Sequence, residues 1–283
     1  MRKIETAPAK RLSEPVNLPL SVNVVTLNEA ANLGRCLESV CGLAAEIVVI
    51  DSGSTDGTRE IAERYGARFI HNDWPGMGAQ KNVALEHCTQ PWVLCLDADE
   101  ALDETLQTRI VETLSGTPQY DGYAVNRLTW FLGDWVRHSW FPEWRVRLAR
   151  RDKARWEGVN PHEWLAVDGR TARLDGFLPH YPVRDLAHHL DKTLGYGRIS
   201  GAELVKRRRR IPQHKLIFSP LWRLVRTLLL KGGWRDGWRG LVIAYTSMFS
   251  AILKYAYAME ATRVRPRDDL PNDPPNDNTP RGG

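Results

Sequence analysis

The chain has 283 residues, of which 42% are hydrophobic and 26% charged, a balance typical of a soluble globular protein rather than a fibrous or disordered one. This length suits one large domain, or one domain with an appendage. The first 16 residues carry positive charge but no apolar stretch, so no signal peptide is expected. The cysteines form no CxxC pair, which favours buried free thiols in a reducing compartment; they are Cys36, Cys41, Cys88 and Cys95.

The net charge of +5 is unevenly distributed along the chain. Residues 206–260 hold twelve lysines and arginines against two acidic residues, a net charge of +10. The rest of the chain holds 27 basic and 32 acidic residues and therefore has a net charge of −5. This division predicts an acidic body with a separate basic contact surface.

Both ends of the chain, residues 1–17 and 264–283, are polar and proline-containing and are predicted to be disordered. Between them we expect a main domain over 18–200 and a basic arm over 201–263. Four apolar strand-like segments are expected early in the main domain: LPLSVNVVTL, EIVVI, ARFIH and PWVLCL. Helical segments alternate with them: NLGRCLESV, TDGTREIAERYG (capped by Thr55 or Asp56) and MGAQKNVALEHC. This alternation predicts a parallel sheet covered on both faces.

Polar residues follow three of these strands, in TLNEA (26–30), IDSGSTDGT (50–58) and LDADE (96–100). Strand ends of a parallel sheet share one edge, where ligands bind, so these side chains should converge. Clustered carboxylates repel one another unless a cation lies between them, and Mg²⁺ or Mn²⁺ with phosphate suits the pattern Asp97-x-Asp99. Alternatively, DADE simply begins the helix ALDETLQTRIVETL, because acidic residues favour helix N-termini. The absence of GxGxxG and GxxxxGK[ST] argues against dinucleotide and P-loop sites.

Several motifs together resemble a known family. VNVVTLNEAANLGRCLESV, VVIDSGSTDGT, GAQKNVAL and WVLCLDADE are similar to the ordered motifs of inverting family 2 glycosyltransferases. NRLTWFLGDWVRHSWFPEWRVRLARRDKARWEGVNPHE and HYPVRDLAHHLDKTLGYG narrow the resemblance to bacterial lipopolysaccharide-core β-glucosyltransferases. The resemblance implies the α/β GT-A fold, a Rossmann-like, mostly parallel sheet flanked by helices, here followed by a basic amphipathic helical arm.

The resemblance also implies an activity. A hexose-like sugar would pass, with inversion, from a nucleotide-diphosphate sugar (UDP-sugar favoured) to a saccharide of the lipopolysaccharide core or another lipid-linked glycan, with Mg²⁺ or Mn²⁺. Carried over by position, the site would contain Asn28 and Glu29 near the nucleotide, Asp51 at the base, Lys81 near the phosphates, Asp97 at the ribose or metal, and Asp99 as the main metal ligand.

The general base implied by the resemblance is Glu163, with His162 completing the metal shell or touching phosphate. The family pattern G-x-x-HE is here EGVNPHE, and Pro161 restricts the backbone before the pair, which weakens this assignment. Glu143 and Asp134 are rival bases.

Other candidate contacts follow from the same stretch. Arg145 and Arg147 could steady the diphosphate, although alternating arginines also fit a solvent-facing strand. Trp140 and Trp144 could stack on acceptor sugars, although tryptophans of this kind also build cores.

The arm begins with KRRRR and continues with two apolar stretches, LIFSPLWRLVRTLLLK and LVIAYTSMFSAIL. The second has thirteen uncharged residues, short of the roughly 20 that a spanning helix needs. We therefore expect helices that lie on an anionic membrane surface or pack on the enzyme, placing the protein in the cytoplasm, peripheral on the inner face of the plasma membrane. A packed hairpin with a solvated basic rim is the alternative, and no nucleic-acid-binding module is recognisable.

Two rival functions stay open from the sequence. A sugar nucleotidyltransferase needs a glycine- and arginine-rich loop after the first strand, where TLNEAANLGRC offers a single glycine. A non-catalytic, membrane-bound sugar-binding or scaffold protein is the other.

Overall fold

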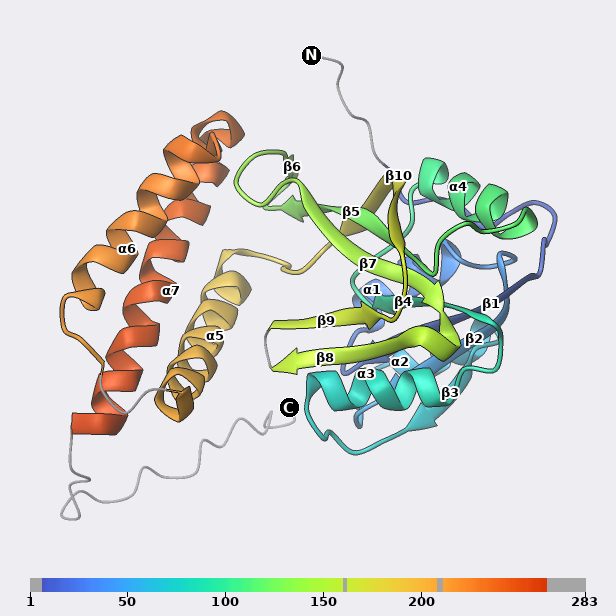
Figure 1. Cartoon of the computed structure of the whole chain (residues 1–283), viewed down its shortest axis with the longest axis horizontal. Helices are drawn as coiled ribbons and strands as arrows, with labels where there is room; N and C mark the ends of the chain where they lie inside the picture. The colour runs from blue at the N-terminus through green and yellow to red at the C-terminus, as the bar shows by residue number, and fades with distance from the viewer. Residues whose placement is uncertain (1–6, 160–161, 208–210, 264–283) are drawn as a thin grey trace, which may run out of the picture.

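The computed structural model describes residues 7–159, 162–207 and 211–263, and Figure 1 shows a body of sheet and helices beside a helical arm. The strands are β1 (Leu18–Thr26), β2 (Ala44–Asp51), β3 (Arg68–His71), β4 (Trp92–Asp97), β5 (Gly122–Phe131), β6 (Asp134–Val136), β7 (Glu143–Arg150), β8 (Ala154–Val159), β9 (His162–Val167) and β10 (Thr171–His180). The helices of the body are α1 (Ala30–Glu38), α2 (Thr58–Arg64), α3 (Met77–Glu86) and α4 (Glu104–Ser115).

The main sheet is mixed and mostly parallel, as expected. Its order is β10-β5-β7-β4-β1-β2-β3, with β6 paired to β5. β1 pairs in parallel with β2 and β4, β2 with β3, and β5 with β10, whereas β7 runs antiparallel to both of its neighbours. β8 and β9 form a separate antiparallel hairpin. The carboxyl ends of β1, β2 and β4 therefore share one edge.

Helices cover both faces of the sheet because successive side chains of a strand point to opposite sides. Leu94 and Leu96 of β4 belong to the large apolar cluster with α1, α2 and α4. Val93 and Cys95 of the same strand face the other way, where Leu85 of α3 and the β8–β9 hairpin cover them. All four cysteines are buried and free, which confirms the expected state of the thiols.

The turn before α2 differs from the expected capping. Neither Thr55 nor Asp56 is the N-cap, since α2 begins at Thr58 and its N-cap position is Gly57, without a side-chain cap. Asp56 instead accepts hydrogen bonds from the Thr58 amide (3.1 Å) and from the Ala30 amide at the start of α1 (3.1 Å). The carboxylate thus satisfies donors of two helices and joins the first two strand-end loops.

The arm consists of α5 (Leu186–Arg207), α6 (Lys215–Val225), a π-helical turn η2 (Arg226–Leu230), a 3₁₀ turn η3 (Gly233–Asp236) and α7 (Gly237–Arg263). A Cβ on Gly197 or Gly201 of α5 would lie 2.7 Å from Leu253 or 2.9 Å from Tyr257 of α7, so these glycines allow the two helices to pack closely. The boundary expected at residue 200 falls inside α5, and the helical arm therefore starts near Leu186.

Asp236 joins the arm to the body. Its buried carboxylate accepts hydrogen bonds from the amides of Arg137 (3.0 Å), His138 (3.2 Å) and Ser139 (2.8 Å), from the Ser139 hydroxyl (2.9 Å) and from the His138 ring (2.8 Å). Burial alone would raise the pKa of Asp236, but these bonds lower it below its ordinary value. The ionised carboxylate therefore fixes the loop after β6 against the arm.

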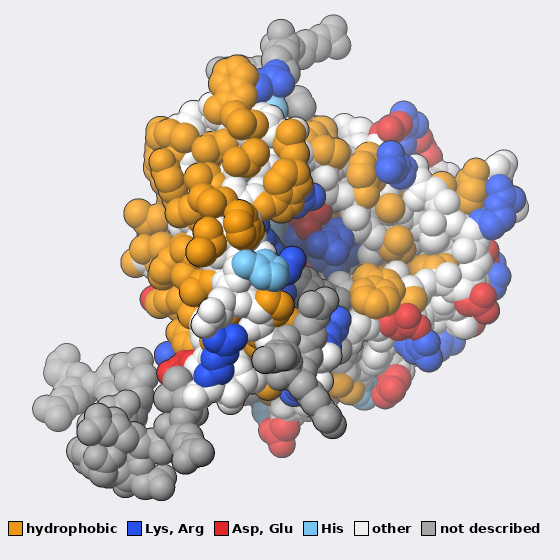
Figure 2. All heavy atoms as spheres, turned by 60° about the vertical axis from the view of Figure 1, so that its left-hand side comes forward, with side chains coloured by type: hydrophobic (Ala, Val, Ile, Leu, Met, Phe, Trp, Pro, Cys, Tyr) orange, Lys and Arg blue, Asp and Glu red, His pale blue; other side chains and the backbone are white. Residues whose placement is uncertain are grey.

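The outer surface of the arm is apolar, and Figure 2 shows hydrophobic side chains gathered over it. At least 40% of each of the following side chains on α6, η2 and α7 is exposed: Ile217, Phe218, Leu221, Trp222, Val225, Leu229, Leu230, Trp238, Leu241, Tyr245 and Phe249. We call this surface the apolar arm face. Large exposed apolar patches mark sites of contact with other proteins or with membranes.

α7 is longer than the thirteen-residue uncharged stretch suggested. The helical segment Gly233–Arg263 has 31 residues, and its most apolar 18-residue stretch has a mean hydropathy of 1.3, which by length and composition alone would permit a membrane crossing. The uncharged stretch of thirteen residues lies within a longer helix that includes Lys254, and the expectation of helices that lie on the membrane surface or pack on the enzyme stays a prediction. Packing against α5 and α6 covers part of it.

Candidate active site

The carboxyl ends of β1, β2 and β4 bring three loops to one rim. The register places Thr26 of β1 beside Asp51 of β2, and Val25 of β1 beside Asp97 of β4. Because neighbouring strands lie about 4.8 Å apart, the polar residues that follow these strands gather together. The convergence expected from the β-α alternation is present.

Asp51 shapes the loop that follows β2. Its carboxylate accepts hydrogen bonds from the amides of Gly53 (2.8 Å) and Ser54 (2.7 Å) and from the Thr26 hydroxyl (3.0 Å). Burial would raise the pKa of Asp51, but these donors hold it below its ordinary value. The carboxylate is ionised at neutral pH and largely engaged with its own loop.

Asn28 and Glu29 occupy the loop after β1. Asn28 has a positive φ of 55°, which asparagine tolerates better than most residues, and its side-chain oxygen accepts from the Thr55 amide (2.8 Å). Glu29 accepts a hydrogen bond from Asn32 (2.9 Å). Burial raises the pKa of Glu29, and the Asp99 carboxylate adds to this. The negative charge of Asp99 therefore disfavours ionisation of Glu29.

Asp97 is neutralised from within the protein. Its two oxygens contact Lys81 Nζ (2.6 Å) and Arg147 Nη2 (2.8 Å), and the same Arg147 nitrogen lies 2.5 Å from Glu100 Oε1. Arg127 approaches Glu100 from the other side (3.2 Å). Burial would raise the pKa of Asp97, but Lys81 and Arg147 hold it well below its usual range. This stabilisation is present above the pKa of the unfolded carboxyl, about 3.9, and is lost as the pH falls through the depressed folded value.

Two expected phosphate contacts therefore lie in this ion-pair network. Arg147 is almost fully buried, with 5% of its side chain exposed, and the Lys81 side chain is 9% exposed, with its ammonium 4.4 Å from the Trp156 ring centre. Arg147 does not point into solvent as a diphosphate clamp, because two carboxylates hold it beneath the rim. The expectation for Arg147 is corrected accordingly.

Asp99 faces a different partner, the ring of His180 at the end of β10. Asp99 Oδ2 lies 3.5 Å from His180 Nε2, and the other ring nitrogen of His180 lies 3.3 Å from the Thr129 hydroxyl. Burial would raise the pKa of Asp99, but His180 lowers it below its ordinary value. Sequence reasoning missed His180, although it is a polar residue at the end of a strand, the same signal that indicated Asp51, Asp97 and Asp99.

Glu163 lies on β9 and approaches α3 at a glycine. A Cβ on Gly78 would be 3.6 Å from Glu163 Cγ, so a larger residue there would narrow the space for the glutamate. Glu163 Oε1 is buried and, within the described residues, has no hydrogen-bond partner. An unpartnered buried carboxylate oxygen is costly, which is typical of a group that meets a ligand. Asn160, Pro161 and the side chain of His162 lie outside the described part of the structure.

The arm also reaches this rim through α5. Tyr196 has its pKa raised by burial and then by the carboxylates of Asp99 and Asp97, with a smaller effect from Glu163. Lys192 donates a hydrogen bond to the Pro182 carbonyl (2.6 Å), and its charge helps to lower the Asp99 pKa. No local pattern in the sequence indicated either residue, since their position depends on how α5 docks.

The rival bases are less suited to proton transfer. Glu143 is clamped by Arg127 (2.8 Å) and Arg145 (2.7 Å). Burial would raise its pKa, but the two arginines lower it to about 2, which makes it a weak base at neutral pH. Asp134 is 54% exposed and lies near Arg137 (3.7 Å).

The two expected acceptor-stacking tryptophans make contacts within the protein. Trp140 packs edge-on against Phe131 (5.2 Å between ring centres) and near His189 (6.1 Å), within an apolar cluster that includes α7. Trp144 is covered by the Arg173 guanidinium, 4.5 Å from its ring centre. Trp140 is therefore a packing residue between body and arm, which corrects its expected role.

Asp99 and His180 at the rim could hold a divalent cation whose remaining coordination positions are filled by a ligand and water. Among the described side chains, no group of three or more His, Cys, Asp or Glu residues could enclose a metal ion. Asp99 and His180 form a pair, and Asp99 Oδ1 has no partner among the described residues. Mg²⁺ is commonly held by one or two carboxylates together with phosphate oxygens and water, so a pair suffices.

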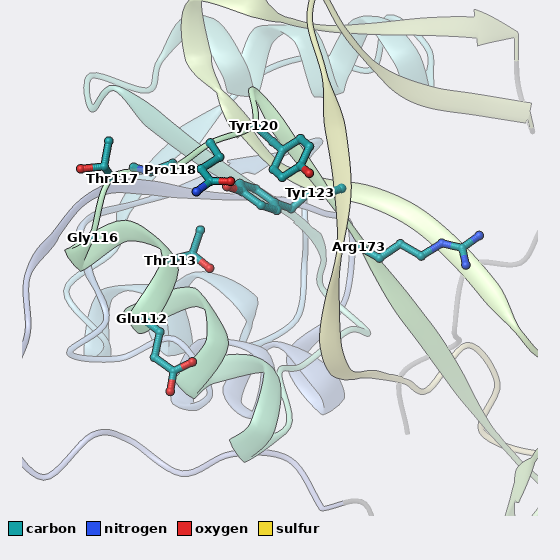
Figure 3. Close-up of a pocket in the computed structure, with 10 residues that line it drawn as sticks. Glu112, Thr113, Gly116, Thr117, Pro118, Tyr120, Tyr123 and Arg173 are labelled. Carbon is teal, nitrogen blue, oxygen red and sulfur yellow. The ribbon is translucent and has the colours of Figure 1, made fainter.

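A separate hollow lies at the opposite edge of the sheet. It has a volume of about 270 Å³ and lies between the end of α4 and the starts of β5 and β10, with Glu112, Tyr120 and Tyr123 in its wall (Figure 3). β5 runs in the same direction as β4, so this hollow is remote from Asp97 and Asp99. Glu112 is the one carboxylate among its described lining residues, so the hollow lacks the converging acidic side chains of the rim.

Comparison with known proteins agrees with this architecture. Residues 21–165 match the model of glycosyl transferase family 2. The chain is 34% identical over 266 residues to the lipopolysaccharide core biosynthesis glycosyltransferase LpsC of Rhizobium meliloti, covering 89% of this chain and 97% of the relative. It is 26% identical to an uncharacterised glycosyltransferase of Rickettsia prowazekii, covering 84% and 85%. A solved mannosyltransferase from Pyrobaculum calidifontis, in complex with GDP-mannose and Mn²⁺, is 16% identical with a TM-score of 0.49, covering 89% and 88%.

The chain belongs to glycosyl transferase family 2. The resemblance drawn from the sequence motifs is thereby confirmed, and the mostly parallel sheet with flanking helices is the GT-A arrangement that it implied.

We expect Arg147→Met to lower the free energy of unfolding by about 3–5 kcal/mol, because it leaves the buried Glu100 carboxylate and the largely buried Asp97 carboxylate without their shared cation. Urea unfolding at neutral pH measures this change. The matched control is Arg145→Met on the same strand, whose side chain is 44% exposed and whose removal should cost less than about 1 kcal/mol. Equal losses in the two variants would show that the buried network is not what stabilises this edge.

Proposed function

We propose that this protein transfers a hexose-like sugar, with inversion, from a nucleotide-diphosphate sugar to a saccharide of the lipopolysaccharide core or another lipid-linked glycan. The Rhizobium relative, a lipopolysaccharide core biosynthesis glycosyltransferase that matches over 97% of its length, supports this acceptor class. A UDP-sugar is the favoured donor on the motif resemblance.

One observation carries the proposal: two carboxylates in contrasting environments lie around one rim. Asp99 has a lowered pKa beside His180, whereas Glu163 presents a buried oxygen without a described partner. Glu163 packs against Gly78 of α3, and Lys81 of the same helix contacts Asp97, two residues before Asp99. Glycosyl transfer uses one carboxylate that holds a metal and another that accepts a proton. The different surroundings of Asp99 and Glu163 suit these two roles.

Each residue then has a task. Asp99 and His180 would hold Mg²⁺ or Mn²⁺, which supplies positive charge for the departing diphosphate. Glu163 Oε1 would accept the proton of the acceptor hydroxyl as that oxygen attacks the anomeric carbon. The loops built by Asp51 and Asn28 would border the nucleoside. Lys81 and Arg147 keep Asp97 ionised and in place, which limits the movement of the strand end that carries Asp99.

We expect Asp99→Asn to weaken Mn²⁺ binding by about 100-fold or more, because it removes the principal anionic ligand. Calorimetric titration of Mn²⁺ in the presence of UDP measures this without requiring turnover. Asp134→Asn, which neutralises an exposed carboxylate elsewhere, is the matched control and should bind Mn²⁺ as the unmodified protein does. Unchanged Mn²⁺ affinity in Asp99→Asn would refute the metal role.

Glu163→Gln should lower turnover by about 10²–10⁴ while leaving nucleotide-sugar binding intact, because the amide cannot accept the proton. Product formation and donor binding are measured on the same preparation. Glu143→Gln serves as the control and should retain turnover, since that carboxylate is held by two arginines. A reversal of the two results would transfer the base role to Glu143.

Two other functions remain distinguishable by a single assay, the metal-dependent hydrolysis of a nucleotide sugar without acceptor. A glycosyltransferase hydrolyses the donor slowly under these conditions. A non-catalytic scaffold hydrolyses none. A sugar nucleotidyltransferase instead consumes nucleoside triphosphate and releases pyrophosphate.

We further propose that the arm attaches the enzyme to the inner face of the plasma membrane. The apolar arm face supplies insertion area, and exposed Arg223 and Arg226 lie along it where anionic headgroups would meet them. Of the polybasic run, Arg208, Arg209 and Arg210 lie outside the described residues. The acceptor of a peripheral enzyme of this kind would be lipid-linked.

We expect the double variant Phe218→Ser and Trp222→Ser to reduce partitioning onto vesicles of anionic lipid by at least about 100-fold, because each buried aromatic side chain contributes about 1.5–3 kcal/mol. Co-sedimentation with vesicles measures the change. Trp74→Ser, at an exposed tryptophan of the body, is the control and should bind normally. If the double variant binds as well as the control, the apolar arm face does not insert.

A further inference from the structure

A short series of aromatic side chains lies beside the rim and takes no part in the site described above. Trp130 of β5 and Trp135 of β6 are directly opposed in the register of the two strands, and their rings meet edge to face with 5.1 Å between centres. Trp135 meets the ring of Tyr181, which follows β10, in the same way at 5.6 Å. We call these three side chains the aromatic strip.

The aromatic strip joins the rim at Tyr181. The Tyr181 amide donates a hydrogen bond to the Asp99 carbonyl (2.8 Å), and Tyr181 directly follows His180, whose ring faces the Asp99 carboxylate. Arg35 of α1 covers one face of Tyr181, with its guanidinium 3.8 Å from the ring centre. Tyr181 is therefore held through both its backbone and its ring, and it ends the strip next to Asp99.

The other end of the aromatic strip is held by the arm. Arg239 of α7 donates a hydrogen bond to the Leu132 carbonyl (2.9 Å) in the turn between β5 and β6 and lies 4.0 Å from Asp134, the residue before Trp135. The same guanidinium lies 4.8 Å from the ring centre of Trp238, which belongs to the apolar arm face. A continuous series of contacts thus leads from the apolar arm face through the strip to Asp99.

The rings of the aromatic strip do not fill the core. Trp130, Trp135 and Tyr181 are each half-buried, and none belongs to the apolar clusters of the described residues, whereas the neighbouring Phe131 is fully buried. Edge-to-face contacts place the edge of one ring against the face of the next, so part of the ring surface stays uncovered. An electron-rich ring face attracts weakly positive C–H groups, and a sugar ring presents such groups on its flat side.

We propose that the aromatic strip binds the acceptor saccharide, with Trp130 and Trp135 stacked on sugar rings and Tyr181 holding Trp135 in position. This inference rests on the proposed function, because it takes the ligand to be the glycan that receives the transferred hexose. An acceptor whose lipid end lies at the apolar arm face would lie along the strip and present its terminal sugar beside Asp99.

The test uses the whole protein and, as the probe, core oligosaccharide released from bacterial lipopolysaccharide and freed of lipid, so that membrane attachment does not contribute. Saturation-transfer NMR should detect contact between the unmodified protein and the C–H groups of the sugars. Trp130→Ala and Trp135→Ala should each weaken binding at least about fivefold, because each removes a stacked ring. Trp74→Ala is the matched control and should not change binding, since Trp74 is exposed and follows β3, the strand of the main sheet farthest from β5.

Two further variants separate stacking from apolar packing. Trp135→Phe keeps an aromatic face and should bind the oligosaccharide within about threefold of the unmodified protein, whereas Trp135→Leu has no such face and should bind as weakly as Trp135→Ala. Melting temperatures verify that each variant is folded. Binding by folded Trp135→Leu as strong as that by Trp135→Phe would overturn the proposal. So would undiminished binding by Trp130→Ala and Trp135→Ala, or a lack of saturation transfer from the unmodified protein.

Calorimetric titration of nucleotide sugar with Mn²⁺ on the same samples distinguishes this inference from the proposed function. If the protein binds nucleotide sugar and the alanine variants keep their affinity for the oligosaccharide, the aromatic strip is rejected and glycosyl transfer stands. If the protein binds no nucleotide sugar and the alanine variants lose the oligosaccharide, glycosyl transfer is rejected and the strip stands as a saccharide site.

Discussion

The rim depends on how the protein neutralises the carboxylates at the end of β4. Glu100 is fully buried and the Asp97 side chain is three-quarters buried, so removing these carboxylates from water would be costly without nearby cations. Arg147, contributed by the antiparallel strand β7, bridges both, while Lys81 from α3 completes the pairing of Asp97. The network joins three elements on which the site is built. Asp99 differs from these two carboxylates because its partner among the described residues is His180 rather than a lysine or arginine.

A second constraint is the junction of the arm with the body. The carboxylate of Asp236 gathers five donors from the loop after β6, and close packing of α5 on α7 at Gly197 and Gly201 makes the arm one unit. As a result α5 carries Tyr196 and Lys192 to the rim while α6 and α7 present the apolar arm face. A surface suited to a membrane and a site suited to chemistry are thereby held at a defined distance. Such rigidity would suit the lipid-linked acceptor that we propose.

Several elements of the site followed from the chain itself. Periodicity predicted the strands of the first hundred residues. Strand-end polarity predicted the edge to which Asp51, Asp97 and Asp99 belong, and the cysteine pattern predicted the buried thiols. His180 is also a polar residue at the end of a strand, but β10 lies outside the alternating strands and helices of the first hundred residues. It was therefore not predicted. Arg147 was misassigned because an alternating strand pattern does not reveal which face carries a buried acid. Trp140 was misassigned because aromatic composition cannot separate a packing surface from a sugar platform.

The sequence by itself determined the class of fold, the family and the rim that forms the candidate site, because these depend on local periodicity and on short motifs whose residues are neighbours in the chain. Tertiary structure alone decided which charges cancel one another, that Asp99 meets His180, that Lys192 of α5 reaches the Pro182 carbonyl and that Lys231 reaches the Ser139 carbonyl. The contacts of Arg147 with Asp97 and of Lys231 with Ser139 join residues 50 and more than 90 positions apart, and Coulomb energy and desolvation depend on distance in space, which no local pattern records.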